Sequence, residues 1–202
     1  MNERRRPVVV KLGGSYAFSP LLRAWLRALE GARGVVVVPG GGPFADVVRE
    51  AQPRMGFNDV AAHRMALLAM AQFAEAIAAL GRGFVVVESR TAIAGALSAG
   101  HVPVFCPWPM LRDATDVPRS WDVTSDSLAL WLATVIDASA VVLIKHVSAA
   151  AGGETSRLLD AAFPAYRVRF AGEVFIAGPD DVPSRFDPAH PPGQQLRRSV
   201  LV

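Results

Sequence analysis

The stretch Val8-Val9-Val10-Lys11-Leu12-Gly13-Gly14-Ser15 decides the fold class, because a run of β-branched residues ends there in a lysine and two glycines. Such a run predicts a strand that is buried on both faces of a parallel sheet. Ligands of open α/β sheets lie outside the carboxyl ends of the strands, where adjacent glycines let backbone N–H groups approach an anion. The charge of Lys11 favours phosphate over a neutral ligand. A plain tight turn explains so short a motif equally well.

A second valine run, over residues 34–39, ends in Gly40-Gly41-Gly42-Pro43, where Pro43 suits the first turn of a helix. Two successive strands that both end in glycines predict one crevice served by two loops. Further strands are predicted over 84–88, 102–105 and 140–145. The strands alternate with helical patterns, which predicts an α/β fold with a mostly parallel central sheet.

The helical patterns differ in how clearly their ends are marked. Helices are predicted over 20–29, 43–51, 58–80, 91–99, 127–137 and 156–162. Pro53 is expected to end the second helix, and Asn58 or Asp59 to cap the third. Prolines after residue 105 predict a polar loop up to Trp121, a candidate lid. Weaker patterns predict strands over 168–170 and 174–176 and an extended segment over 179–192.

Composition limits the number of domains, the partners and the kinds of site that the chain can have. The chain has 202 residues, 51% of them hydrophobic, and a formal net charge of +3, which predict one domain with a sizeable core. The charge lies mostly near the two ends without interleaved aromatic residues, so no nucleic acid is expected. The single Cys106 lacks the companions that a disulfide or a structural zinc site needs. Without an apolar signal region or an uncharged long helix, we expect a cytoplasmic protein with no membrane contact.

Three motifs in this order and spacing resemble the amino acid kinase superfamily. They are Lys11-Leu12-Gly13-Gly14-Ser15, Pro39-Gly40-Gly41-Gly42-Pro43-Phe44-Ala45 and Thr124-Ser125-Asp126-Ser127, and the resemblance spans residues 8 to about 147. It implies a three-layer α/β/α fold that transfers the γ-phosphoryl group of ATP, with Mg²⁺ held by the ATP phosphates rather than by protein ligands. It implies a single domain over 1–202, with an acceptor-binding lobe over 1–120 and a shortened nucleotide-binding lobe over 121–202. A homodimer through the long helix is also implied, although the same helix could be buried within one subunit.

A histidine narrows the resemblance to a branch of the family. His63-Arg64-Met65 is similar to the motif of isopentenyl phosphate and fosfomycin kinases, whose histidine contacts an acceptor phosphate or phosphonate. An ordinary helical histidine is the other interpretation. Together with the segment 121–126, the motif is most similar to small kinases that phosphorylate aminomethylfuran-methyl phosphate on the route to methanofuran-type cofactors. The resemblance therefore implies a small acceptor that already bears phosphate.

The resemblance also implies roles for individual residues. The catalytic residues would be Lys11, Asp126 and Lys145. ATP would be bound by Lys11, Gly13, Gly14, Ser15 and Lys145, and the acceptor by Gly40, Gly41, Gly42, His63, Asp122 and Thr124. Asp126 would orient Lys11 or a second cation, but charge complementarity in the first turn of a helix explains this residue equally well.

The half of the chain expected to bind the nucleotide departs from the family. Lys145-His146-Val147-Ser148-Ala149-Ala150 replaces an acidic, glycine-containing turn, and no lysine follows Lys145. Either Lys145 or an arginine such as Arg157 supplies the second positive charge, or nucleotide binding is weakened. Two alternatives to a kinase of aminomethylfuran-methyl phosphate stay open. One is a kinase of another small phosphate, phosphonate or carboxylate, and the other is a non-catalytic binding or storage protein on the same fold.

Overall fold

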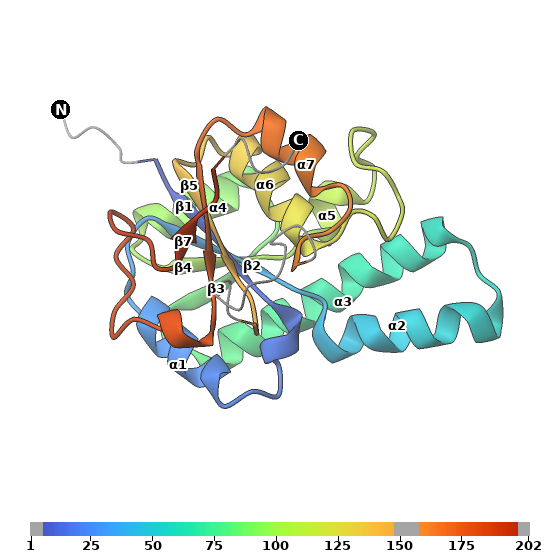
Figure 1. Ribbon diagram of the computed structural model, residues 1–202, viewed down its shortest axis with the longest axis horizontal. Coiled ribbons are helices and arrows are strands. Elements are labelled where there is room, and N and C mark those ends of the chain that lie inside the picture. Colours follow the sequence, from blue (N-terminus) through green and yellow to red (C-terminus); the bar gives the residue numbers. More distant parts are fainter. Residues whose placement is uncertain (1–5, 148–157, 198–202) are drawn as a thin grey trace.

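The computed structural model of the chain describes residues 6–147 and 158–197. Its elements in order are β1 (Val8–Leu12), η1 (Gly14–Tyr16), α1 (Leu21–Leu29), β2 (Val35–Pro39), α2 (Gly42–Met55), α3 (Asp59–Leu80), β3 (Phe84–Val87), α4 (Arg90–Ser98), β4 (Val102–Phe105), α5 (Trp108–Leu111), α6 (Ser125–Val135), β5 (Ala140–Ile144), α7 (Phe163–Arg169), β6 (Glu173–Ala177), η3 (Pro179–Asp181) and β7 (Gln194–Gln195). The predicted alternation of strands and helices is confirmed (Figure 1).

One seven-stranded sheet, in the order β3-β4-β2-β1-β5-β6-β7, runs through the molecule. Its strands are parallel except β7, which pairs antiparallel with β6. The valine-rich β1 lies between β2 and β5, and Leu12 is in register with Pro39 on one side and Ile144 on the other. The segments that follow these three strands therefore meet at one edge of the sheet, as the first motif predicted.

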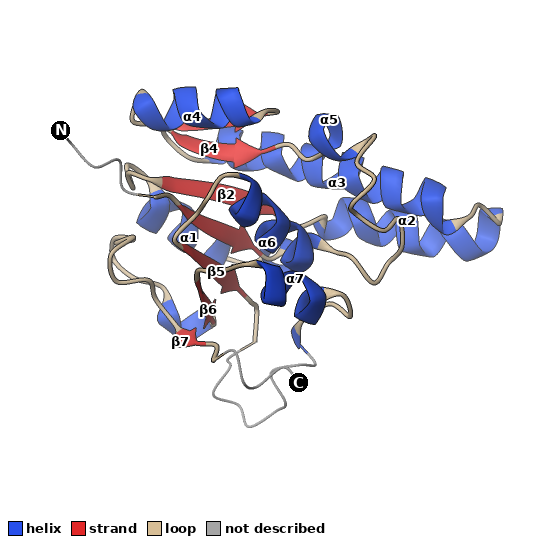
Figure 2. Cartoon of the chain, turned by 90° about the horizontal axis from the view of Figure 1, so that it is seen from above, coloured by secondary structure: helices blue, strands red, loops and turns tan. Residues whose placement is uncertain are grey.

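Helices cover both faces of the sheet, because each strand buries the side chains of both faces (Figure 2). One core contains Val9 and Val36 and packs against α4, α6 and α7. The other contains Val8 and Val10 and packs against α1 and the second half of α3. This arrangement confirms the predicted α/β fold with a mostly parallel central sheet.

The antiparallel pair of α2 and α3 projects beyond the sheet (Figure 1). The prediction that Pro53 ends α2 is wrong, since the helix continues to Met55 and ends at Gly56, whose φ is +75°. A proline this close to the end of a helix removes only one late hydrogen bond. Asn58 caps α3 as predicted, through a bond from the Ala61 N–H to its side chain. Among the described residues no helix is long and apolar enough to cross a membrane.

Predictions for the second half of the chain held less well. Of residues 168–170, expected as a strand, the first two belong to α7 and Phe170 follows that helix. The strand expected over 174–176 is part of β6. Of the helix expected over 156–162, residues 156 and 157 lie outside the described ranges, and 158–162 are not α-helical. The expected loop after residue 105 contains the short helix α5, and the segment 179–192 begins with the turn η3.

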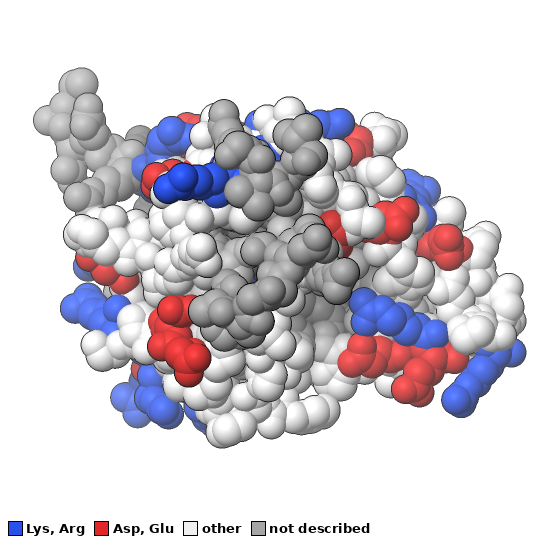
Figure 3. All heavy atoms as spheres, in the orientation of Figure 1, with Lys and Arg blue, Asp and Glu red and all other residues white. Residues whose placement is uncertain are grey.

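Charged side chains on the face shown in Figure 3 are interspersed, with arginines close to acidic residues. Two such exposed pairs within the described residues are Arg49 with Asp46 and Arg112 with Asp113. Exposed pairs of this kind contribute little to stability. The stability of the fold therefore rests on the two apolar cores.

The two glycine loops touch backbone to backbone. A Cβ atom added at Gly40 would lie 2.4 Å from the backbone nitrogen of Gly14, and one added at Gly14 would lie 2.3 Å from that of Gly42. Gly42 itself has φ of +53°. Only glycine allows the first and second loops to approach this closely.

We expect Gly40→Ala to lower the free energy of unfolding by about 1–3 kcal/mol, because the new methyl group meets backbone that cannot turn away. Gly95→Ala is the matched control, since a Cβ at this helical position meets nothing within 4 Å. The control should stabilise the protein by about 0.5–1 kcal/mol. Urea unfolding of both variants measures the difference, and equal effects would show that the loop contact is not tight.

Candidate active site

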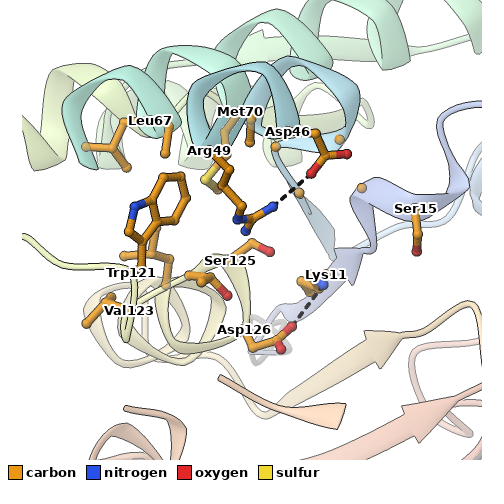
Figure 4. A pocket seen from close by; sticks show the side chains of 18 of the residues that line it. Lys11, Ser15, Asp46, Arg49, Leu67, Met70, Trp121, Val123, Ser125 and Asp126 are labelled. Atoms are coloured by element: carbon orange, nitrogen blue, oxygen red, sulfur yellow. Dashed lines mark hydrogen bonds and ion pairs between the residues drawn. The ribbon is translucent and has the colours of Figure 1, made fainter. Parts of the chain in front are cut away.

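A cavity of about 300 Å³ opens at the carboxyl edge of the sheet, between the glycine loops, α2, α3 and the start of α6 (Figure 4). Ten of the residues singled out from the sequence line it: Lys11, Gly14, Ser15, Gly40, Gly41, Gly42, His63, Thr124, Asp126 and Lys145. They come from segments more than a hundred residues apart. The crevice predicted from two glycine clusters is therefore present, and α6 and β5 complete it.

A buried carboxylate joins two ammonium groups at the floor of the cavity. Lys11 Nζ lies 2.9 Å from Oδ1 of Asp126, and Lys145 Nζ lies 2.5 Å from Oδ2 of the same carboxylate. Lys145 also donates to the backbone carbonyl of Leu158, at 2.6 Å. The side chains of Lys11 and Asp126 are about 95% buried. With all three groups ionised the cluster has a net charge of +1, which favours an anion beside it.

The three groups set each other's protonation. Burial alone would raise the pKa of Asp126, but the ammonium groups of Lys11 and Lys145 outweigh burial, so that the pKa lies below its ordinary value. Burial and the neighbouring Lys11 ammonium lower the pKa of Lys145 to about 8, and Asp126 opposes them. Asp126 is therefore a carboxylate held between two cations, with neither the basicity nor a free oxygen that a general base needs.

The start of α6, which carries Asp126, is held by a residue that sequence reasoning missed. Thr124 occupies the N-cap position but makes no side-chain cap. Instead Asp160 accepts bonds from the backbone N–H and hydroxyl of Thr124, each at 2.9 Å, and from the N–H and hydroxyl of Ser127. Burial raises the pKa of Asp160, although these hydrogen bonds oppose the change. No local motif could have shown this cap, because Asp160 is more than thirty residues away.

Two of the predicted site residues, Gly13 and Asp122, are not among the residues that line the cavity. The N–H of Gly13 donates to the carbonyl of Ile144 at 3.1 Å, so it is occupied within the fold and does not face the cavity. A Cβ there would lie 2.8 Å from that carbonyl, which explains the glycine structurally. Asp122 is exposed, accepts from the Ser120 hydroxyl at 3.3 Å and does not line the cavity.

His63 lies in the second turn of α3 with its side chain buried at the cavity wall. Burial lowers its pKa below the ordinary value, and the charge of Arg119 lowers it further, while a hydrogen bond with the backbone of Ser120 opposes both. The imidazole is therefore neutral at neutral pH. A neutral ring has a single N–H, and the bond with the Ser120 backbone engages it, so His63 supplies no positive charge to a ligand.

Beside Trp121, from the segment 121–126, the cavity is lined by Arg49, which the motifs did not indicate. Arg49 of α2 pairs with Asp46 at 2.8 Å, and its guanidinium lies 4.7 Å from the ring centre of Trp121. Trp121 donates through its indole N–H to Gln52, at 2.7 Å. The only sequence signal was the spacing of Asp46 and Arg49 by three residues, which places both on one face of a helix.

The side chains around the cavity do not form a cluster of metal ligands within the described residues. No group of three or more histidine, cysteine or acidic side chains within the described ranges could hold a metal ion. Both oxygens of Asp126 already face ammonium groups. The residues present do not form a magnesium site, so a divalent cation would have to arrive with the phosphates of a nucleotide.

Lysine titration tests the buried cluster directly, because the chain has only two lysines, Lys11 and Lys145. In an NMR titration of the protein labelled with ¹³C-lysine, one side-chain signal should titrate near pH 8, and Lys145→Arg should remove it. The unfolded chain keeps this proton up to about pH 10.5. The unfolded state thus binds more protons between pH 8 and 10.5, and the contribution of this group to stability rises over that window. A Lys145 signal that titrates only near pH 10.5 would contradict the buried geometry.

Comparison with known proteins agrees with the motifs and the fold. The family model described as "Amino acid kinase family" matches residues 6–150. A curated relative, [5-(aminomethyl)furan-3-yl]methyl phosphate kinase of Methanocaldococcus jannaschii, is 29% identical over 142 residues, 69% of this chain and 65% of the relative. The chain thus spans just under two thirds of that relative.

Solved structures share the architecture. The uridylate kinase of Archaeoglobus fulgidus superposes with a TM-score of 0.65 at 16% identity, covering 95% of this chain and all of that one. The UMP kinase of Ureaplasma parvum has the same TM-score and identity, with 89% of this chain and 92% of that one covered. At such identity these structures show the fold alone. The matched family model spans most of the chain, and the chain belongs to the amino acid kinase family.

Proposed function

We propose that the protein is a kinase that transfers the γ-phosphoryl group of ATP to a small acceptor that already carries phosphate. One observation carries the proposal: the ion cluster of Lys11, Asp126 and Lys145 lies on the same cavity as two glycine loops and the start of α2. The first N–H groups of a helix have no partners within the helix and attract anions. The phosphates of ATP and of an acceptor, brought together in this cavity, would face the lysines of the ion cluster on one side and the N–H groups at the start of α2 on the other.

The proposed reaction needs little covalent help from the protein. An oxygen of the acceptor phosphate forms a bond to the γ-phosphorus of ATP while the bond from that phosphorus to the β,γ-bridging oxygen breaks, which yields ADP and a diphosphate. Lys11 and Lys145 would offset the negative charge on the transferring group, and the N–H groups of Gly41 and Gly42 would hold the acceptor side. Asp126 would fix the positions of both ammonium groups. Positioning and charge stabilisation are the main sources of rate in phosphoryl transfer.

The second positive charge is assigned to Lys145. It lies at the end of β5, and its Nζ reaches the same carboxylate as Lys11. The other candidate, Arg157, lies outside the described residues. A lysine from the end of β5 would thus replace the later lysine that the family resemblance led us to expect. We propose accordingly that residues 1–120 form most of the acceptor-binding lobe and 121–202 most of the nucleotide-binding lobe, with Lys11 and Trp121 at their junction and Mg²⁺ entering as the MgATP complex.

The first candidate acceptor is [5-(aminomethyl)furan-3-yl]methyl phosphate, which the name of the Methanocaldococcus jannaschii relative gives as the substrate of that enzyme. The cavity supports an acceptor of this kind, because Leu67, Met70 and Trp121 form an apolar wall away from Lys11 (Figure 4). A flat organic group packs well against such a wall. The acceptor would therefore place its phosphate near Lys11 and its ring toward Trp121.

A homodimer and a cytoplasmic location stay predictions. Met65 and Leu68 on α3 and Val47 on α2 are exposed apolar side chains, which is compatible with an interface on the projecting helix pair. The alternative function, ligand binding without transfer, follows from the altered segment after β5. It differs from the kinase in one measurable respect, the consumption of ATP.

ATP consumption by the purified protein with magnesium tests the proposal. The panel contains [5-(aminomethyl)furan-3-yl]methyl phosphate, isopentenyl phosphate, a phosphonate and an amino-acid carboxylate. Turnover with a phosphate ester, and formation of the corresponding diphosphate by mass spectrometry, supports the proposal. Turnover with the carboxylate alone would reject the acceptor class. Binding of a phosphate ester with no turnover at all would establish the non-catalytic alternative.

Lys11→Ala should lower kcat/KM by about 10²–10³-fold, because it removes a charge that acts on the transferring group. The fold should persist, since Asp126 keeps its ion pair with Lys145. Arg90→Ala, on the exposed start of α4, serves as the control and should keep full activity. Steady-state kinetics with circular dichroism of each variant provide the measurement. Full activity in Lys11→Ala would show that the first loop does not have the proposed role in transfer.

A further inference from the structure

We propose that Arg49 binds the phosphate of the acceptor and thereby selects phosphorylated acceptors. The inference rests on the proposed function and goes further by naming the specificity-determining residue. Arg49 lies at the middle of α2 and lines the cavity that contains the ion cluster. In Figure 4 its guanidinium points into the cavity, with Trp121 on one side and Lys11 on the other. A phosphate close to Lys11 lies on the side toward which Arg49 points.

Most of the hydrogen-bonding capacity of Arg49 is unused. A guanidinium has five N–H donors in a planar fork. Only Nη1 donates to a protein acceptor within the described ranges, to Oδ1 of Asp46 at 2.8 Å, so that Nε and Nη2 keep their donors for a ligand. The Arg49 side chain is 51% exposed, which leaves it accessible from the cavity. Such a fork matches a phosphate through two parallel charge-assisted bonds.

Neighbouring side chains hold the guanidinium in place. The Trp121 ring packs 4.7 Å from its central carbon, and Gln52 accepts from the indole N–H. Gln52 in turn donates to Asp59 at the start of α3, at 2.7 Å. The chain of contacts ties the segment before α6 to both helices of the projecting pair. A guanidinium held before the ligand arrives loses less entropy on binding.

The alternative candidate for this role, His63, supplies no charge, because burial and Arg119 lower its pKa. Lys11 and Lys145 share the carboxylate of Asp126. Arg49 is a cation of the cavity wall, and Asp46, its ion-pair partner, is itself exposed. Solvent weakens an exposed ion pair, so a dianionic phosphate can compete for the guanidinium. Acceptors without phosphate would not form these charge-assisted bonds with Arg49 and would bind more weakly.

The experiment compares two ligands that differ only in the phosphate: [5-(aminomethyl)furan-3-yl]methyl phosphate and the corresponding alcohol. Calorimetry without ATP measures Kd for each, with the wild type and with Arg49→Met. We expect the substitution to raise Kd for the phosphate by about 10- to 100-fold and to change Kd for the alcohol by less than about 2-fold. In kinetics, KM for the acceptor should rise by a similar factor, with kcat and KM for ATP nearly unchanged. Arg49→Lys should restore only part of the affinity, because it keeps the charge and loses the fork.

Arg54→Met is the matched control, since Arg54 lies in the last turn of the same helix, is exposed and does not line the cavity. It should leave every constant unchanged. Equal loss for phosphate and alcohol in Arg49→Met would mean that Arg49 only supports Trp121, and it would overturn the inference. If Arg49→Met selectively loses binding of the phosphate while the wild type shows no turnover, the proposed kinase activity is rejected and the inference about Arg49 stands. A wild type that binds neither ligand would overturn both.

Discussion

The Asp126 carboxylate, buried between the ammonium groups of Lys11 and Lys145, is the interaction on which the site depends. A buried charge is costly unless it is paired, and here the carboxylate is paired with both ammonium groups. The arrangement requires β1, β5 and the start of α6 to meet at one point of the sheet. It also ties catalysis to the fold, because the groups proposed to act on phosphate are those that make the burial of the carboxylate tolerable.

The backbone imposes a second constraint at the same edge. The two glycine loops lie so close that side chains at Gly14 or Gly40 would collide with the opposite backbone. Their packing brings the start of α2 next to the end of β1, which places the positive end of a helix beside Lys11. Gly13 shows that not every glycine of the motif faces a ligand, since its N–H is used to join β1 to β5.

The cavity has two ends of different chemistry. One end has the ion cluster and the glycine loops, which suit the transfer of a phosphoryl group. The other has the Trp121 ring, Leu67 and Met70, which suit an organic group, with Arg49 between the ends. An acceptor with one phosphate and a small flat body fits this division. The family fold by itself fits many acceptors, so the side chains of α2 and α3 and of the segment before α6 determine which one is used.

The sequence by itself determined the fold class, the family and most of the cavity lining, because valine runs, glycine clusters and helix caps are local signals with a direct structural meaning. It could not show that Asp160 caps α6 from more than thirty residues away or that Arg49 packs on Trp121. It also placed 168–170 in a strand, which was wrong, and it could not show that the cavity is lined without Asp122. Tertiary packing decided these points, since the direction of a side chain and its partner depend on contacts between segments that lie far apart in the chain.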